Sequence, residues 1–172
     1  TLRRAHAIHP IAAVQNEYSP WSRNVEIGVL DATRELGAAL VAFSPVARGF
    51  LADGVHSPEA LEPGDIRRGM PRFQPDNFPR NLELLGRFRA IAAEAGCTPA
   101  QLSLGWVLSR GEHVVAIPGT TSIDHLAENF ATPAELPREA LEKVDRLMTP
   151  DAVAGPRYPA VTQAEIDTEE FA

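Results

Sequence analysis

The sequence predicts an α/β fold built around a parallel sheet, and three apolar segments carry this prediction. Residues 11–15 and residues 38–43 are short apolar runs of strand length. Between them, apolar residues recur at helical spacing over residues 25–36, and Gly37 ends that segment. A strand, a helix and a second strand in this order form a βαβ unit, which requires parallel strands. Residues 114–117 are a third apolar run, rich in β-branched side chains, and predict another buried strand. We expect the three strands to be adjacent in chain order.

Two further helices are expected between the second and third strands. They follow residues 52–79, a polar segment rich in Pro and Gly, and loops of this length are usually functional lids or disordered. Apolar residues at helical spacing predict the first helix over residues 84–95. Thr98-Pro99-Ala100-Gln101 is a capping box with proline at the first helical position, and it opens the second helix. Leu102 and Trp106 are expected on the buried face of that helix.

The two ends of the chain differ from its central part. Residues 1–8 have the pattern of the last turn of a helix, so we expect the chain to be a piece of a longer protein. Apolar spacing predicts a final helix over residues 137–148. The segment from Pro150 onward is rich in proline and ends in acidic residues, which predicts a poorly ordered extension.

Length and composition restrict the class of protein. The chain has 172 residues, of which 44% are hydrophobic and 23% are charged, as is typical of one globular unit. The net charge of −7 argues against binding to nucleic acid or to anionic membranes. The sequence contains no apolar run of membrane-spanning length. Cys97 is the single cysteine, which excludes a disulfide framework and a cysteine metal cluster. We therefore expect a cytoplasmic protein without a metal site.

The third strand is followed by a pattern that favours anion binding. Pro118 and Gly119 end the strand, and Ser122 is suited to cap a helix that begins at the next residue. The residues expected on the buried face of this helix are Ile123, Leu126 and Phe130. Free backbone N–H groups and the positive end of the helix dipole would face an anion, usually a phosphate. Because strand–turn–helix units occur throughout α/β proteins, the spacing alone leaves this assignment open.

Two side chains stand at the predicted carboxyl ends of strands, where parallel α/β proteins bind ligands. Gln15 ends the first strand and Phe43 ends the second. From the residues alone, Gln15 serves equally well to satisfy nearby backbone groups. From the residues alone, Phe43 is also consistent with ordinary packing in the core. Arg48 is also consistent with an ordinary ion pair at the surface.

The order of residues in several segments is more specific than their spacing. These segments are Val14-Gln15-Asn16-Glu17-Tyr18-Ser19, the run from Phe43 to Leu51, Thr98 to Leu108, Ile117-Pro118-Gly119-Thr120-Thr121 and Leu126-Ala127-Glu128-Asn129. Together they resemble the aldo-keto reductase family, whose members fold as TIM barrels and reduce carbonyl groups with NADPH. The resemblance implies that residues 1–149 form only the C-terminal part of a TIM (β/α)8 barrel, strands six to eight with their helices. Residues 150–172 would then be a C-terminal tail.

The resemblance also implies a binding site for NADP(H), with NAD(H) as the alternative cofactor. Gln15 would hydrogen-bond the nicotinamide carboxamide, and the ring of Phe43 would stack on the nicotinamide. The residues after Phe43 would cover the pyrophosphate, with Arg48 placed to pair with a phosphate. The implied cofactor-binding residues are Gln15, Phe43, Ser44, Pro45, Val46, Arg48, Ile117, Gly119, Thr120, Thr121, His125, Glu128 and Asn129.

The adenosine end of this site departs from the family pattern. Glu128 and Asn129 would address adenine, and Thr120 with the helix N-terminus would address the 2′-phosphate. Gly119 stands where many members have lysine, and His125 stands where many have arginine. We therefore expect weak discrimination in favour of NADPH, and we expect it to fade as the pH rises and the imidazole loses its charge.

Catalytic residues are not expected in this chain. The resemblance places the family's Asp, Tyr, Lys and His on earlier strands, and Lys143 lies on a peripheral helix too far from Tyr18 to replace the missing pair. In a full-length context the function would be NADPH-dependent reduction of aldehydes and ketones to alcohols, with a small carbonyl compound as substrate. The chain alone is expected to be inactive.

Two alternatives remain at this stage. The chain is either the cofactor-binding portion of such a reductase or a catalytically inactive half-barrel remnant that binds a nucleotide or a partner chain. A phosphate-binding module from an unrelated barrel fits the spacing but not the residue order. A three-stranded open sheet has unpaired edges and an exposed face, so self-association is expected.

Overall fold

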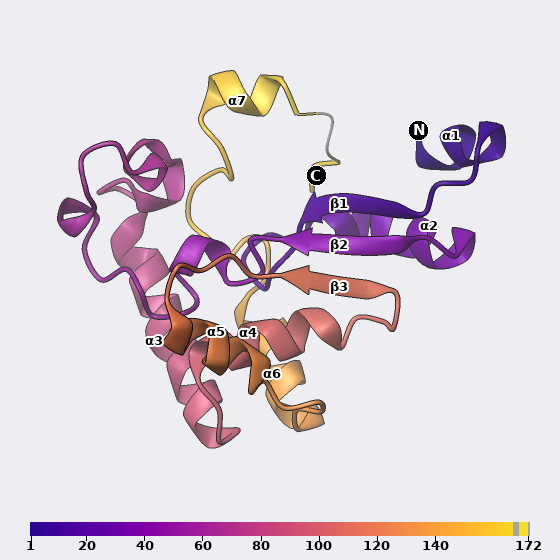
Figure 1. Cartoon of the computed structure of the whole chain (residues 1–172). Helices are drawn as coiled ribbons and strands as arrows, with labels where there is room; N and C mark the ends of the chain where they lie inside the picture. The colour runs from indigo at the N-terminus through magenta and orange to yellow at the C-terminus, as the bar shows by residue number, and fades with distance from the viewer. Residues whose placement is uncertain (167–168, 172) are drawn as a thin grey trace.

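The computed structural model describes residues 1–166 and 169–171 (Figure 1). Its strands are β1 (Ala13–Glu17), β2 (Ala39–Phe43) and β3 (Val114–Ile117). Its α-helices are α1 (Leu2–Ile8), α2 (Val29–Leu36), α3 (Phe78–Glu94), α4 (Pro99–Leu108), α5 (Ile123–Phe130), α6 (Arg138–Leu147) and α7 (Ala160–Ala164). Short 3₁₀ turns are η1 (Asn24–Ile27), η2 (Ala47–Gly49), η3 (Pro58–Ala60), η4 (Ile66–Gly69) and η5 (Pro71–Phe73).

The three strands form one parallel sheet in the order β1-β2-β3, as the sequence predicted. Their arrows point the same way in Figure 1, so the three carboxyl ends lie at one edge. The first strand begins and ends two residues later than predicted, so Gln15 lies mid-strand and Glu17 is the last residue. A charged residue can end this strand because Ser22 and Tyr158 donate hydrogen bonds to its carboxylate.

The helices pack on one face of the sheet. Leu40 and Ala42 of β2 point into this core, where they meet the fully buried Trp106 of α4 and Phe88 of α3. The opposite face is open at β3, where Val115 and Ile117 are about half exposed. The strand pairing aligns side chains in rows on this open face, because paired residues of parallel strands point the same way.

Both predicted helices before β3 are present, although α3 begins at Phe78, six residues before the predicted start. The helix α3 ends before Gly96, which has a left-handed φ of 69°. At the start of α4 the Thr98 hydroxyl accepts from the Gln101 N–H, and the Gln101 side chain accepts from the Thr98 N–H, so the capping box is complete. Leu102 and Trp106 are fully buried, as predicted.

The segment between β2 and α3 is packed rather than solvated. Met70 and Phe73 are buried in the core, and the ring of Phe73 contacts both Trp21 and Phe50. Arg67 pairs with Asp65 through two side-chain atoms 2.6 Å apart. This segment therefore forms a fixed wall beside the carboxyl edge of the sheet.

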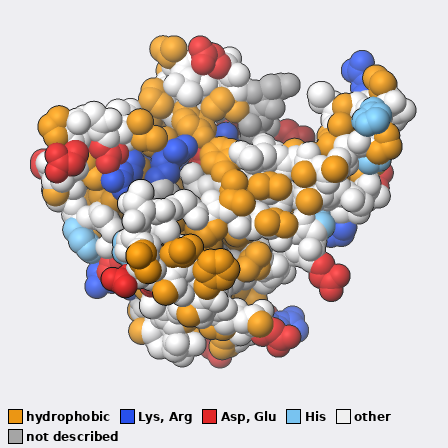
Figure 2. Space-filling model, viewed as in Figure 1, with side chains coloured by type: hydrophobic (Ala, Val, Ile, Leu, Met, Phe, Trp, Pro, Cys, Tyr) orange, Lys and Arg blue, Asp and Glu red, His pale blue; other side chains and the backbone are white. Residues whose placement is uncertain are grey.

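The expected burial of one face of α5 is wrong. Ile123 and Phe130 are 83% and 84% exposed, and Leu126 is also exposed. This helix contacts α4, where the Gln101 side chain donates to the Glu128 carbonyl oxygen, but its apolar stripe faces away from the core. No element within the described residues covers the stripe. Figure 2 shows the resulting hydrophobic side chains over α5 and the neighbouring sheet.

The expected disorder of the C-terminal segment is also wrong for its described residues. Asn81 of α3 is fully buried, and its side chain exchanges two hydrogen bonds with the backbone of Ala154. The Arg72 guanidinium donates to the Gly155 carbonyl oxygen. The segment then crosses the end of β1, where Tyr158 contacts Glu17. Buried polar side chains thus fix a segment whose own composition predicts no structure.

Candidate functional site

A cleft of about 870 Å³ opens beyond the carboxyl ends of β2 and β3 and is called here the strand-end cleft. Its walls come from the turn after β2, the segment before α3, the start of α4, the turn after β3, and α5. The sequence-predicted residues that line it are Ser44, Pro45, Val46, Arg48, Gly119, Thr120, Thr121, His125, Glu128 and Asn129. Most of the predicted set therefore comes together in one place, although its members are separated by about half of the chain.

The turn after β2 is held in a strained backbone conformation. Ser44, Ala47 and Arg48 have positive φ values of 51°, 53° and 57°, which non-glycine residues seldom adopt. Each such residue costs on the order of 1–3 kcal/mol, and conformations of this kind cluster at ligand sites. The buried Ser103 hydroxyl donates to the Pro45 carbonyl oxygen at 2.6 Å and fixes the turn against α4. The wall of the cleft is therefore rigid at this point.

The turn between β3 and α5 presents polar groups to the cleft. The Ser122 hydroxyl accepts from the His125 N–H at 3.3 Å, which caps the helix as predicted. The Thr120 hydroxyl accepts from the Ser122 N–H at 3.1 Å. Thr121 and His125 are exposed to the cleft. The remaining N–H groups and the helix dipole make this end of the cleft favourable for an anion.

Three predicted residues lie outside this cleft. Gln15, Phe43 and Ile117 occupy the open face of the sheet instead. Phe43 pairs with Glu17 on one side and with Ile117 on the other, so these three side chains form one row at the carboxyl edge. Gln15 lies one row further from the carboxyl edge, because β1 ends at Glu17 and not at Gln15 as predicted. The cleft and this row meet at Ser44, which directly follows Phe43.

The guanidinium of Arg48 points away from the strand-end cleft. It donates to the Tyr158 hydroxyl at 3.1 Å and lies 3.4 Å from the Glu17 carboxylate. Its own carbonyl oxygen accepts a hydrogen bond from Arg67 at 2.9 Å. An ion pair with Glu17 holds the Arg48 side chain in this structure, and its pairing with a phosphate stays a prediction.

Sequence reasoning missed several residues of the cleft. Asp53 and Asp65 line it from the segment between β2 and α3. The Arg67 side chain holds the pKa of the Asp65 carboxyl below its usual range through their hydrogen bonds. That segment has no regular spacing, so no pattern indicated which of its residues would turn inward.

Tyr18 and Lys143 do not form a proton-donating pair. Tyr18 is fully buried, and its hydroxyl donates to Glu26 at 2.8 Å. Burial, with a further contribution from Glu26, raises the pKa of Tyr18 well above its usual value. Lys143 lies on α6 and pairs with Glu94 and Glu139. The Tyr18 hydroxyl and the Lys143 ammonium thus have different partners.

Comparison with known proteins decides the family. A model of the aldo/keto reductase family matches residues 1–149. The chain belongs to the aldo/keto reductase family. It is 40% identical to the aldo-keto reductase str7 of Strobilurus tenacellus over 174 residues, which cover 99% of this chain and 52% of that protein.

Solved aldo-keto reductases share the fold. The glycerol dehydrogenase AKR11B4 from Gluconobacter oxydans superposes with a TM-score of 0.79 at 22% identity, over 92% of this chain and 48% of that one. A thermostable aldo-keto reductase, Tm1743, solved in complex with the inhibitor epalrestat, gives a TM-score of 0.60 at 27% identity, over 85% of this chain and 44% of that one. The chain spans about half the length of these relatives.

Membership of the aldo/keto reductase family supports an α/β fold of the TIM-barrel type. Members of this family generally use NAD(P)H and bind carbonyl substrates. Among the described residues, no helix is both long and apolar enough to cross a lipid bilayer.

Proposed function

We propose that this chain is the cofactor-binding portion of an NADP(H)-dependent aldo-keto reductase and corresponds to strands six to eight of the barrel. In a full-length context it would reduce small aldehydes or ketones to alcohols in the cytoplasm, with NAD(H) as a second cofactor. The observation that carries the proposal is the convergence of the turn after β2 and the start of α5 on the strand-end cleft. Parallel α/β proteins bind their ligands at this edge.

The two ends of the cofactor would contact different kinds of side chains. The helix N-terminus with Thr120 and His125 suits the 2′-phosphate, while Glu128 and Asn129 suit adenine. The strained turn at Ser44 would cover the pyrophosphate, and the ring of Phe43 would stack on the nicotinamide. For Arg48 to pair with the pyrophosphate, its guanidinium would have to leave Glu17 and Tyr158.

The cofactor assignment predicts a pH-dependent preference that resides in His125. Histidine imidazoles in general lose their positive charge between pH 6 and pH 8. At pH 6 we therefore expect His125→Ala to lower the ratio of NADPH affinity to NADH affinity by a factor of about two to five, and at pH 8 we expect the variant to match the unmodified chain. Dissociation constants from cofactor fluorescence measure both ratios.

The matched control for this test is His9→Ala. His9 is exposed in the segment between α1 and β1 and does not line the strand-end cleft, so its loss is expected to leave both ratios unchanged. If His125→Ala keeps the NADPH preference at pH 6, then His125 does not contact the 2′-phosphate. If neither cofactor binds at all, the proposed function itself is wrong.

The alternative function, an inactive half-barrel that binds a partner chain, has one supporting observation. Leu126 and Phe130 of α5 line an open groove of about 420 Å³ with Leu108 and Val115. A groove of this kind is costly to leave in contact with water. In a whole barrel, the remaining strands and helices would cover it.

Self-association through this groove is the corresponding prediction for the isolated chain. We expect Phe130→Glu to raise the dissociation constant of the self-associated form at least about tenfold, because a buried charge has no partner there. Light scattering after size exclusion measures the mass over a range of concentrations. The control is Val161→Glu on α7, which is equally exposed but distant from the groove along the chain. Equal masses for all three proteins would contradict the prediction.

A further inference from the structure

Three guanidinium groups gather on one buried carboxylate at the carboxyl end of β1. Glu17 lies 3.4 Å from Arg48 and 3.8 Å from Arg157. Arg72 joins through Ser22, whose hydroxyl donates to Glu17 at 2.8 Å and accepts from Arg72 at 3.1 Å. Positive charge therefore exceeds negative charge immediately around Glu17.

Arg157 is the member of this group whose charge is least compensated. Its side chain is only 9% exposed, and its Nε is buried without a hydrogen-bond partner. The Glu17 carboxylate at 3.8 Å is too distant for a hydrogen bond. Within residues 1–166 and 169–171 the Arg157 guanidinium forms no hydrogen bond, although it lies 4.8 Å from the centre of the Tyr158 ring. A buried guanidinium without a hydrogen-bonded counter-ion is costly to maintain.

Arg72 places a second guanidinium beside it. The Nη1 of Arg72 donates to the Trp21 carbonyl oxygen at 2.8 Å, and its Nε donates to Gly155. Burial lowers the pKa of Arg72 to about 10. The nearby charge of Arg157 also lowers this pKa, whereas the carboxylates of Glu17 and Glu170 raise it. Among the described residues, the Nη2 of Arg72 has no hydrogen-bond acceptor. Both arginines thus retain donors for a further anionic partner.

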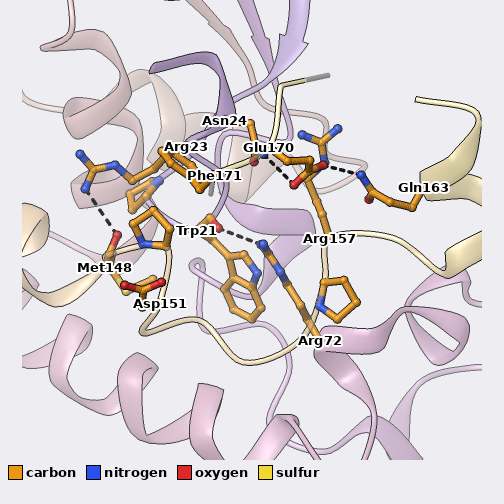
Figure 3. A pocket seen from close by; sticks show the side chains of 13 residues that line it. Trp21, Arg23, Asn24, Arg72, Met148, Asp151, Arg157, Gln163, Glu170 and Phe171 are labelled. Atoms are coloured by element: carbon orange, nitrogen blue, oxygen red, sulfur yellow. Dashed lines mark hydrogen bonds between the residues drawn. The ribbon is translucent and has the colours of Figure 1, made fainter. Parts of the chain in front are cut away.

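A pocket provides the space for such a partner. Arg72 and Arg157 line a cavity of about 340 Å³ together with Trp21 (Figure 3). Asp151 and Glu170 also line it, and among the described residues neither forms an ion pair with Arg72 or Arg157. Glu170 instead accepts hydrogen bonds from the amide groups of Asn24 and Gln163.

We propose that Arg157 and Arg72 form a binding site for a small oxyanion, the carboxylate or phosphate group of a ligand. The planar fork of a guanidinium matches the two oxygens of either group. Glu17 shares its row of the sheet with Phe43, so the site adjoins the carboxyl edge on the open face. The source of the oxyanion is then either free phosphate or a carbonyl compound that also carries a carboxylate. The site goes beyond the proposed cofactor cleft and does not depend on it.

Calorimetric titration of the full chain tests the site with two probes at matched ionic strength, inorganic phosphate and pyruvate. We expect at least one probe to bind, and Arg157→Met to weaken its binding at least about tenfold. Acetone, which lacks the carboxylate of pyruvate, is expected not to bind. Binding of phosphate alone identifies phosphate as the source, whereas binding of pyruvate alone identifies a carboxylate.

The melting temperature without ligand gives a second readout. A purely structural role of Arg157 would give the opposite sign of the change. Because Arg157→Met removes a buried charge that has no hydrogen-bonded counter-ion, we expect a raised melting temperature in the absence of oxyanions. A structural ion pair with Glu17 would instead give a lowered melting temperature. Arg157→Lys keeps the charge but loses the fork, so it is expected to weaken probe binding even if Arg157→Met does not fold.

Arg146→Met is the matched control, since Arg146 is exposed on α6 and pairs only weakly with Glu142 at 3.8 Å. It is expected to bind both probes as the unmodified chain does. The proposal is overturned if neither probe binds, or if Arg157→Met binds them undiminished. It is also overturned if His125→Ala, and not Arg157→Met, abolishes phosphate binding, because the phosphate then occupies the strand-end cleft.

Discussion

The 172-residue chain expressed alone is expected to leave the NADPH absorbance at its background rate when 4-nitrobenzaldehyde is added. Carbonyl reduction requires a proton donor beside the nicotinamide. In the aldo-keto reductases that this chain resembles, the donor is a tyrosine whose pKa is tuned by a lysine. Tyr18 cannot do so here, because it is fully buried and hydrogen-bonded to Glu26. Lys143, the only lysine, is paired with carboxylates on the outside of α6. We therefore expect the isolated chain to show none of the rate enhancement of a full-length reductase. This effect is far larger than that expected from any single substitution in the cleft.

Two variants test whether Tyr18 or Lys143 contributes to any turnover by the isolated chain. Tyr18→Phe and Lys143→Ala are both expected to leave the background rate unchanged, since neither residue touches the strand-end cleft. Turnover above background in the unmodified chain that persists in both variants would mean that another group donates the proton. NADPH binding without turnover would support the proposed division between cofactor binding and catalysis.

Trp106→Ala is expected to cause the largest loss of stability, about 3–5 kcal/mol in the free energy of unfolding. The indole is fully buried, and its ring meets Tyr18 edge-on at 5.4 Å between centroids. Its N–H donates to Asp145 at 3.0 Å, and the Arg110 guanidinium lies 3.9 Å from its centroid. The substitution would leave a cavity and an unpaired acceptor together, in a domain whose total stability is typically about 5–15 kcal/mol.

Urea denaturation at 25 °C measures this change at a protein concentration at which the chain is monomeric, with Phe130→Ala as the control. Phe130 is also a large aromatic residue, but it is 84% exposed, so its truncation is expected to change the stability by less than about 0.5 kcal/mol. The loss of stability in Trp106→Phe is expected to lie between those of the two alanine variants, because this variant keeps most of the packing but loses the hydrogen bond to Asp145. Equal losses for the two alanine variants would contradict the assignment of Trp106 to the centre of the core.

Local patterns predicted the sheet and most helices because their signals lie within a few residues. The capping box at Thr98 and the β-branched run from residue 114 each specify their own element. The exposure of α5 was not predictable from its spacing, because an apolar stripe indicates that a partner exists but not where it lies. The contacts of Glu17 and Arg48 were not predictable for a similar reason. Both side chains form a hydrogen bond with Tyr158, a residue far away along the chain.

The bond between Tyr158 and Glu17 has a consequence for how the molecule forms during synthesis. Its partners are 141 residues apart, so it closes a loop of most of the chain. Closing so long a loop has a high entropic cost unless the intervening elements are already in place. A ribosome must also release Tyr158 before the contact can exist, well after β1 and β2 have emerged. Until then the Glu17 carboxylate and the Arg48 guanidinium face each other without the phenol that joins them, and newly made molecules should mature in a late, separate phase.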